Sequence, residues 1–208
     1  MPDARLIAGL LLVLGPVLGM VPVAHPALIP VWSASRDRHL AIVAAHRRAW
    51  WALNAGFGIA TVATAAGVAI LPLLAGPRDG DRGAAVLVIP AVAYLTGGVL
   101  WCCVLAIRSL VTPTLGDLVA AGTVTEPAET LTGAAQRGLF SGFVLLSGLA
   151  LVVLGAALLA ADVVAGPVAL LQVVAGLGIL GWLVVARDVI PAVIYLPTIL
   201  LGVALLWR

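Results

Sequence analysis

Six long stretches of this chain contain no charged residue and no histidine, and they dominate what the chain can fold into. An α-helix rises about 1.5 Å per residue, so about 20 apolar residues cross the roughly 30 Å hydrocarbon core of a membrane. Of the 208 residues, 63% are hydrophobic and only 10% are charged, which is far from the composition of soluble domains. The stretches comprise residues 6–24, 50–75, 84–107, 138–161, 164–186 and 189–207. We therefore predict an all-α fold, a polytopic membrane bundle of six transmembrane helices that forms a single membrane domain over residues 1–208.

A seven-residue string occurs twice and divides the chain into two related parts. Ile-Pro-Ala-Val-x-Tyr-Leu stands at 89–95 and again at 190–196, and the two copies use both tyrosines of the chain. Matched prolines and tyrosines at identical offsets are hard to obtain by chance, even in so apolar a sequence. We therefore predict two three-helix halves, residues 1–112 and 126–208, joined by a polar linker over residues 113–125.

The two halves are predicted to cross the membrane in opposite directions, as an inverted 3+3 repeat, because each has an odd number of spans. The alternative is that unrelated lipid-facing helices converge on the same few residue types. With both termini outside, seven arginines lie on the cytoplasmic side and four on the other. The positive-inside rule therefore favours both termini outside a cell inner (plasma) membrane.

Two polar segments lie outside the predicted spans. Residues 32–48 carry a cluster of arginines. They either continue the second span as one long helix or lie along the membrane interface with tryptophans among the headgroups, and we favour the interface. The run Thr125-Glu126-Pro127 has the capping and first-turn residues of a helix start. It predicts that the fourth helix begins near Glu126 and projects from the bilayer before it enters.

The side chains that carry most protein chemistry are scarce or badly spaced. The three histidines lie outside the spans, and His39 and His46 would be about 10 Å apart along a helix axis, too far to share one zinc ion. Lysine is absent, which excludes a retinal or pyridoxal Schiff base. We expect no metal, no cofactor and no nucleic-acid partner. Asp188, beside the second repeat string, is a candidate catalytic acid; the alternative is an end-of-helix ion pair with Arg187.

Polar and aromatic residues inside the spans mark the predicted binding site. Unpaired hydroxyl and amide groups are costly in hydrocarbon, so these side chains should face partners rather than lipid. Under inverted symmetry Tyr94 and Tyr195 would face one another near mid-membrane, each beside a proline that frees backbone carbonyls. The alternative is that the prolines and tyrosines only shape the bundle. The predicted ligand-binding residues are Pro90, Tyr94, Trp101, Trp182, Pro191 and Tyr195.

The end of the chain resembles the end of a known kind of protein. The segment RDVIPAVIYLPTILLGVALL, residues 187–206, follows a glycine-rich span and is similar to the closing segments of a family of six-span bacterial integral membrane proteins. The chain length and the polar segment after the first span are similar too. That family has no assigned activity, so the resemblance implies a bacterial multi-pass membrane protein and no catalytic residue.

Three functions agree with these patterns. The first is a membrane protein that binds or transports an apolar small molecule, such as a lipid, an isoprenoid or a vitamin-like compound, in a mid-membrane pocket. The absence of charges within the spans counts against an ion pump. The second is a membrane-embedded, terpene-cyclase-like enzyme on an isoprenoid or lipid substrate, whose aromatic rings would stabilise a carbocation. The third is an accessory subunit of a larger membrane complex, with membrane lipids and a membrane-protein partner or a second copy as its contacts.

Overall fold

The chain is helical almost throughout the part that the structure describes. The computed structural model describes residues 2–75, 80–123, 126–186 and 189–207, and these residues contain no β-strand. The α-helices are α1 (Pro2–Met20), α2 (Arg36–Ala45), α3 (Arg47–Ile70), α4 (Gly80–Ala120), α5 (Glu126–Ala160), α6 (Gly166–Ala186) and α7 (Pro191–Trp207), and the short 3-10 segments are η1 (Val21–Ala24), η2 (Pro26–Ser33) and η3 (Leu71–Leu74). The predicted all-α fold is confirmed.

Within these described ranges, five helices are long and apolar enough to cross a membrane, so the chain is a multi-pass membrane protein. α7 is also apolar but has only 17 residues. It begins at Pro191 because a residue that precedes proline is disfavoured in the helical conformation, which keeps Ile190 out of the helix. The six predicted spans thus correspond to five membrane-length helices and one shorter helix. The membrane-length segments are Ala4–Ala24, Arg47–Leu74, Ala84–Ala120, Thr130–Ala160 and Gly166–Ala186.

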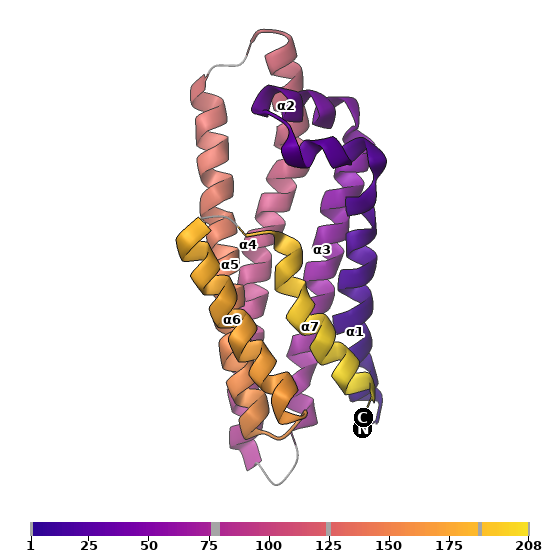
Figure 1. Ribbon diagram of the computed structural model, residues 1–208, viewed down its shortest axis with the longest axis vertical. Coiled ribbons are helices and arrows are strands. Elements are labelled where there is room, and N and C mark those ends of the chain that lie inside the picture. Colours follow the sequence, from indigo (N-terminus) through magenta and orange to yellow (C-terminus); the bar gives the residue numbers. More distant parts are fainter. Residues whose placement is uncertain (1, 76–79, 124–125, 187–188, 208) are drawn as a thin grey trace.

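The helices other than α2 form a ring in which each packs against its neighbours. α1 packs between α3 and α7, and α5 packs between α4 and α6; contacts of α3 with α4 and of α6 with α7 complete the ring. Successive helices run in opposite directions, so that α1 begins and α7 ends at the same end of the bundle (Figure 1). The interior is filled by large buried side chains, among them Leu12, Leu53, Tyr94, Leu151 and Tyr195.

Pairs of glycines allow the closest helix crossings. A Cβ atom on Gly56 of α3 would lie 2.5 Å from the carbonyl oxygen of Gly19 on α1, so a larger residue would force these helices apart. A Cβ atom on Gly176 of α6 would likewise lie 2.6 Å from the carbonyl oxygen of Gly148 on α5. The two crossings therefore join the first two spanning helices of each predicted half by the same device.

At one end of the bundle, α4 and α5 extend well beyond the other helices, and α2 lies across α4 there (Figure 1). With 41 residues, α4 is about 61 Å long, about twice the thickness of a hydrocarbon core. A Cβ atom on Gly116 would lie 2.7 Å from the carbonyl oxygen of Leu40, so α2 rests directly on the α4 backbone. Arg47 at the start of α3 forms an ion pair with Asp117 of α4. We call residues 26–45, 110–120 and 126–135 the cap.

The polar segments of the sequence fold into this cap. α5 begins at Glu126, as predicted. The backbone at His46, with φ of −119° and ψ of 41°, ends α2 before α3 begins. The alternative prediction of one long helix that continues the second span through this region is therefore wrong, and α2 is a separate helix.

The third spanning helix is longer than the sequence suggests. The apolar pattern predicts an end at residue 107, whereas α4 continues to Ala120. The physical reason is that α2 packs on this stretch and buries Gly116, so one face of α4 meets protein where the sequence alone suggests water. Most of the predicted linker 113–125 is consequently the last part of a helix.

Candidate functional site: an aromatic cavity beneath the cap

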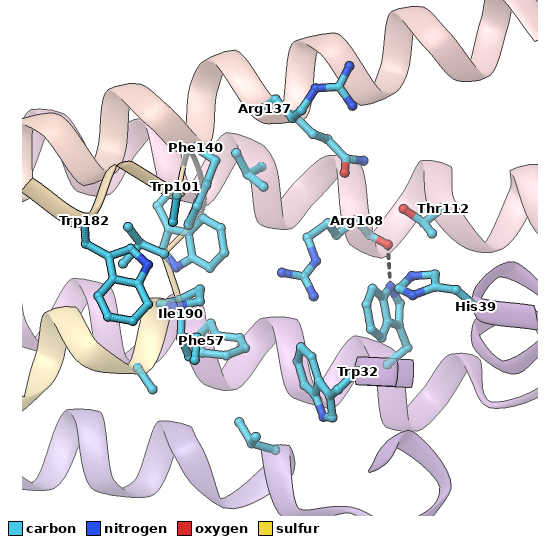
Figure 2. A pocket seen from close by; sticks show the side chains of 18 residues that line it. Trp32, His39, Phe57, Trp101, Arg108, Thr112, Arg137, Phe140, Trp182 and Ile190 are labelled. Carbon is cyan, nitrogen blue, oxygen red and sulfur yellow. Dashed lines mark hydrogen bonds between the residues drawn. The ribbon is translucent and has the colours of Figure 1, made fainter. Parts of the chain in front are cut away.

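A cavity of about 880 Å³ lies where the cap meets the membrane-spanning helices. Its walls come from α3, α4 and α5, from the end of α6 and the start of α7, and from η1, η2 and α2 on the cap side. Figure 2 shows that aromatic side chains surround much of it. The lining residues are Val23, Trp32, His39, Trp50, Phe57, Trp101, Val104, Arg108, Thr112, Gln136, Arg137, Phe140, Trp182, Ala186, Val189, Ile190, Pro191 and Ala192.

Arg108 of α4 places its guanidinium in the middle of the cavity (Figure 2). Its Cζ atom lies 4.8 Å from the ring centroid of Trp50 and 5.9 Å from that of Trp101, both within the range of cation–π attraction. Within the part of the chain that the structure describes, the guanidinium forms no ion pair and no hydrogen bond. The cation is thus held by aromatic faces and keeps its N–H donors available.

Trp50 is fixed beside Arg108 by contacts on two sides. Its Nε1–H donates a hydrogen bond of 2.6 Å to the backbone carbonyl of Arg108. His39 of α2 meets the Trp50 ring edge-on, with 5.6 Å between the ring centroids. Because the ring is buried and held in this way, the face that it turns to the cation is preorganised.

His39 connects the cap electrostatically to the cavity. Burial lowers the pKa of the His39 imidazole below its usual value. A hydrogen bond with the backbone of Val31 opposes this shift, and the positive charge of Arg108 adds to it. His39 is therefore neutral at pH 7 and brings no second positive charge to the cavity.

Trp101 is the centre of an apolar wall on the membrane side. Phe143 stacks on its ring with 5.2 Å between centroids and 11° between planes. Phe140 lies tilted against the same ring at 5.3 Å, and Phe57 meets it edge-on at 5.8 Å. Aromatic pairs of this kind contribute about 0.5–1.5 kcal/mol each beyond the burial of their area. The wall is therefore rigid, and its surface suits a hydrocarbon chain.

Polar side chains lie on the cap side of the cavity. Figure 2 shows Thr112 and His39 on the far side of Arg108 from Trp101. Arg137 stands at the rim, with its guanidinium directed away from the cavity and its Nη1 atom 3.5 Å from where a Cβ on Gly133 would lie. The cavity thus has an apolar end, a cation in the middle and neutral polar groups toward the cap.

The structure brings half of the predicted ligand-binding residues to this cavity. Trp101, Trp182 and Pro191 line it, and Trp182 stands at its exposed edge. The other predicted residues, which are buried between helices and do not line it, are Pro90, Tyr94 and Tyr195.

The two tyrosines make hydrogen bonds at the same turn of α7. Tyr195 Oη lies 2.7 Å from Thr61 Oγ1 of α3, and the Tyr94 hydroxyl donates to the backbone carbonyl of Ile194 at 3.4 Å. Both side chains are buried. Their hydroxyl groups therefore join α3 and α4 to α7 within the protein.

Arg108 is the central residue of the cavity, and the sequence analysis did not predict it. It directly follows an apolar stretch, and an arginine at such a position is usually found at the membrane surface. One signal could have found it. Trp101, Val104, Arg108 and Thr112 recur every three or four residues, which puts them on one face of a helix. Asp188, the candidate acid, lies outside the described residues.

Among the described residues, no group of three or more His, Cys, Asp and Glu side chains could hold a metal ion. No family model, no curated protein and no solved structure matches this chain. Function is therefore inferred from the cavity itself.

Proposed function

We propose that this protein binds a small molecule with an apolar chain in the cavity beneath the cap, as a membrane binding or transport protein. The observation that carries the proposal is the aromatic wall around Trp101 in a cavity of about 880 Å³. Cavities of about 300–1,000 Å³ that are lined mainly by hydrophobic and aromatic side chains are typical small-molecule sites. Lipids, isoprenoids and vitamin-like compounds carry the kind of chain that such a wall accepts.

We place the entrance at one membrane surface, beside the connection between α6 and α7. Support comes from Trp182 and Ile190, which line the cavity and are 62% and 67% exposed. Exposed tryptophan is typical of the membrane–water interface. The apolar chain of a ligand would therefore pass from the lipid to the aromatic wall without crossing the protein core.

We propose further that α7 is a sixth crossing and that the halves form an inverted repeat. When α1, α3 and α4 are matched with α5, α6 and α7 in that order, each helix has equivalent neighbours. α1 packs on α3 and α7, and α5 packs on the equivalent helices, α6 and α4. The glycine crossings Gly19–Gly56 and Gly148–Gly176 follow the same exchange. Both observations support a common origin of the halves.

We also propose that the cap faces the cytoplasm of a bacterial cell and that both termini lie outside its inner (plasma) membrane. The positive-inside rule supports this orientation, because described arginines gather at the cap end of the bundle while Arg5 lies at the other. A reporter enzyme that is active only outside the cytoplasm, fused after the last residue, should be active. An inactive but stably produced fusion contradicts this orientation. The arginines at the cap end are Arg36, Arg38, Arg47, Arg48, Arg108 and Arg137.

Binding is better supported than carbocation chemistry. A cyclase-like enzyme needs open aromatic faces near the developing positive charge. The rings of Trp50 and Trp101 already lie against the guanidinium of Arg108, whose charge repels a carbocation. The geometry of the cavity therefore favours a ligand of the opposite charge or of none.

Mass spectrometry of the protein purified in a mild detergent tests the proposal directly. We expect a stoichiometric apolar molecule that is lost in Ala192→Phe, because Ala192 lines the cavity and the larger ring fills it. Leu196→Phe, about one turn farther along α7 and 56% exposed, is the matched control and should retain the molecule. Equal retention by both variants, or failure of the wild type to bind any added chain-bearing probe, contradicts the proposal.

A further inference from the structure

Arg108 carries a positive charge into an aromatic cavity in which the described residues provide no carboxylate. Of the acids whose side chains the structure describes, Asp117 pairs with Arg47, and Asp162 lies in the turn between α5 and α6 at the opposite end of the bundle. Arg108 is half-buried, so its guanidinium loses part of its hydration, and aromatic faces recover only part of that loss. The cavity is therefore electrostatically incomplete without an anion.

The order of groups along the cavity indicates where that anion would lie. Figure 2 shows Trp101, Phe57 and Phe140 on one side of the Arg108 guanidinium. Thr112 and His39 lie on its other side. An anion at Arg108 would thus have apolar rings toward the membrane and neutral polar groups toward the cap. This is the polarity of a molecule with a charged head and an apolar chain.

We propose that the ligand is an amphiphile whose anionic headgroup, a phosphate or a carboxylate, binds Arg108 while its chain runs along the Trp101 wall toward the lipid. This inference rests on the proposed function and names the class of ligand. A guanidinium presents paired N–H donors that match two oxygens of either headgroup. The hydroxyl of Thr112 and the amide of Gln136 line the same cavity and can donate further hydrogen bonds to the head.

The rings around Arg108 explain why it would prefer an anion on a chain to a free anion. The guanidinium is packed against Trp50 and Trp101, so a small hydrated ion would have to lose water to reach it. A chain that covers the wall of Trp101 and Phe140 supplies favourable burial at the same time. The two contacts therefore reinforce one another in a single ligand.

Binding of bromine-bearing chains, followed by quenching of the cavity tryptophans in a neutral detergent, tests this inference. The probes are a lysophosphatidate, the fatty acid with the same chain and the uncharged monoacylglycerol. We expect at least one anionic probe to bind wild type about tenfold more tightly than the uncharged probe, because a charge-assisted contact is added to the same chain burial. The tighter anionic probe identifies the headgroup. Equal binding of all three overturns this inference alone, whereas binding of none overturns the proposed function.

Variants locate the charge that is responsible. Arg108→Gln should abolish the preference for anionic probes over the uncharged probe, and Arg108→Lys should keep part of the preference. Arg48→Gln, which removes an exposed arginine away from the cavity, is the control of equal charge and should keep all of it. A preference that survives in Arg108→Gln protein with wild-type thermal stability overturns the proposal.

Two further measurements test whether the partner of Arg108 is a free inorganic anion or a carboxylate of the protein. Inorganic phosphate alone should not displace the lysophosphatidate at matched ionic strength, and full displacement overturns the role of the chain. Asp188→Asn tests an internal carboxylate: we expect the anionic preference to be kept or increased. If Asp188→Asn and Arg108→Gln instead lower the unfolding midpoint equally and neither changes anion binding, Asp188 is the partner of Arg108 and the proposal is overturned.

Discussion

Tyr195 Oη lies 2.7 Å from Thr61 Oγ1, and this hydrogen bond joins α7 to α3 inside the apolar bundle. Tyr195→Phe removes it while Thr61 keeps its bond of 2.7 Å to the carbonyl of Phe57, so no hydroxyl is left without a partner. We expect a loss of about 1 kcal/mol in the free energy of unfolding. Titration with a denaturing detergent measures this loss. Thr96→Val, whose hydroxyl is exposed and bonds only within α4, should change the free energy far less.

Close packing of α1 on α3 depends on the absence of a side chain at Gly56. Gly56→Ala places a methyl group against the Gly19 carbonyl oxygen and should destabilise the protein by about 1–3 kcal/mol. The same substitution at Gly178 of α6, where a Cβ atom meets nothing within 4 Å, should be neutral or slightly stabilising because alanine favours helix. Equal unfolding free energies for the two variants contradict the close approach.

Contact of α2 with α4 depends in the same way on Gly116. Gly116→Val drives a side chain into the carbonyl of Leu40 and should lift α2 from α4 without unfolding the spans. Amide hydrogen exchange in residues 36–45 should then accelerate, since these hydrogen bonds lose their protection. Gly133→Val on α5, where a Cβ meets only a flexible arginine side chain at 3.5 Å, should leave that exchange unchanged.

Stability should depend on pH through His39. Its pKa is lowered in the folded protein, so between that value and about 6.5 the unfolded chain binds more protons. The stabilisation is complete above about pH 6.5 and is lost as the pH falls toward the folded pKa. Comparison of unfolding midpoints at about pH 5 and pH 7.5 should show a larger acid-induced loss in wild type than in His39→Gln. Parallel losses in the two proteins contradict this role of His39.

Local signals in the sequence predicted the ends of some helices well. In the sequence Glu126 follows a threonine, a residue type favoured before a helix start, and precedes proline, and α5 begins at Glu126. A capping preference is read over a few residues, so it survives the packing of the rest of the chain. The end of α4 has no such signal, and its continuation past residue 107 depends on α2, which comes from a segment far earlier in the sequence.

The candidate site was only partly predictable, because its geometry also depends on contacts between segments that are far apart in the sequence. A requirement that polar groups avoid lipid correctly directs Tyr94 and Tyr195 into the bundle, where both are buried. It does not distinguish a hydroxyl that bonds Thr61 from one that faces a ligand. Arg108 is the converse case, because its place in a cavity depends on Trp50, which lies 58 positions away in the chain.

The unequal lengths of the helices have a consequence for the surrounding bilayer. α7 spans about 26 Å with its 17 residues, less than a hydrocarbon core of about 30 Å, whereas α4 exceeds that thickness. As the proposed sixth crossing, α7 would require the acyl chains beside it to compress while those beside α4 need not, at an elastic cost of a fraction of a kcal/mol per Å of mismatch. That compression would be concentrated on the flank where we place the entrance to the cavity. Short-chained lipids should accordingly gather there, and the protein should partition into thin membranes in preference to thick ones.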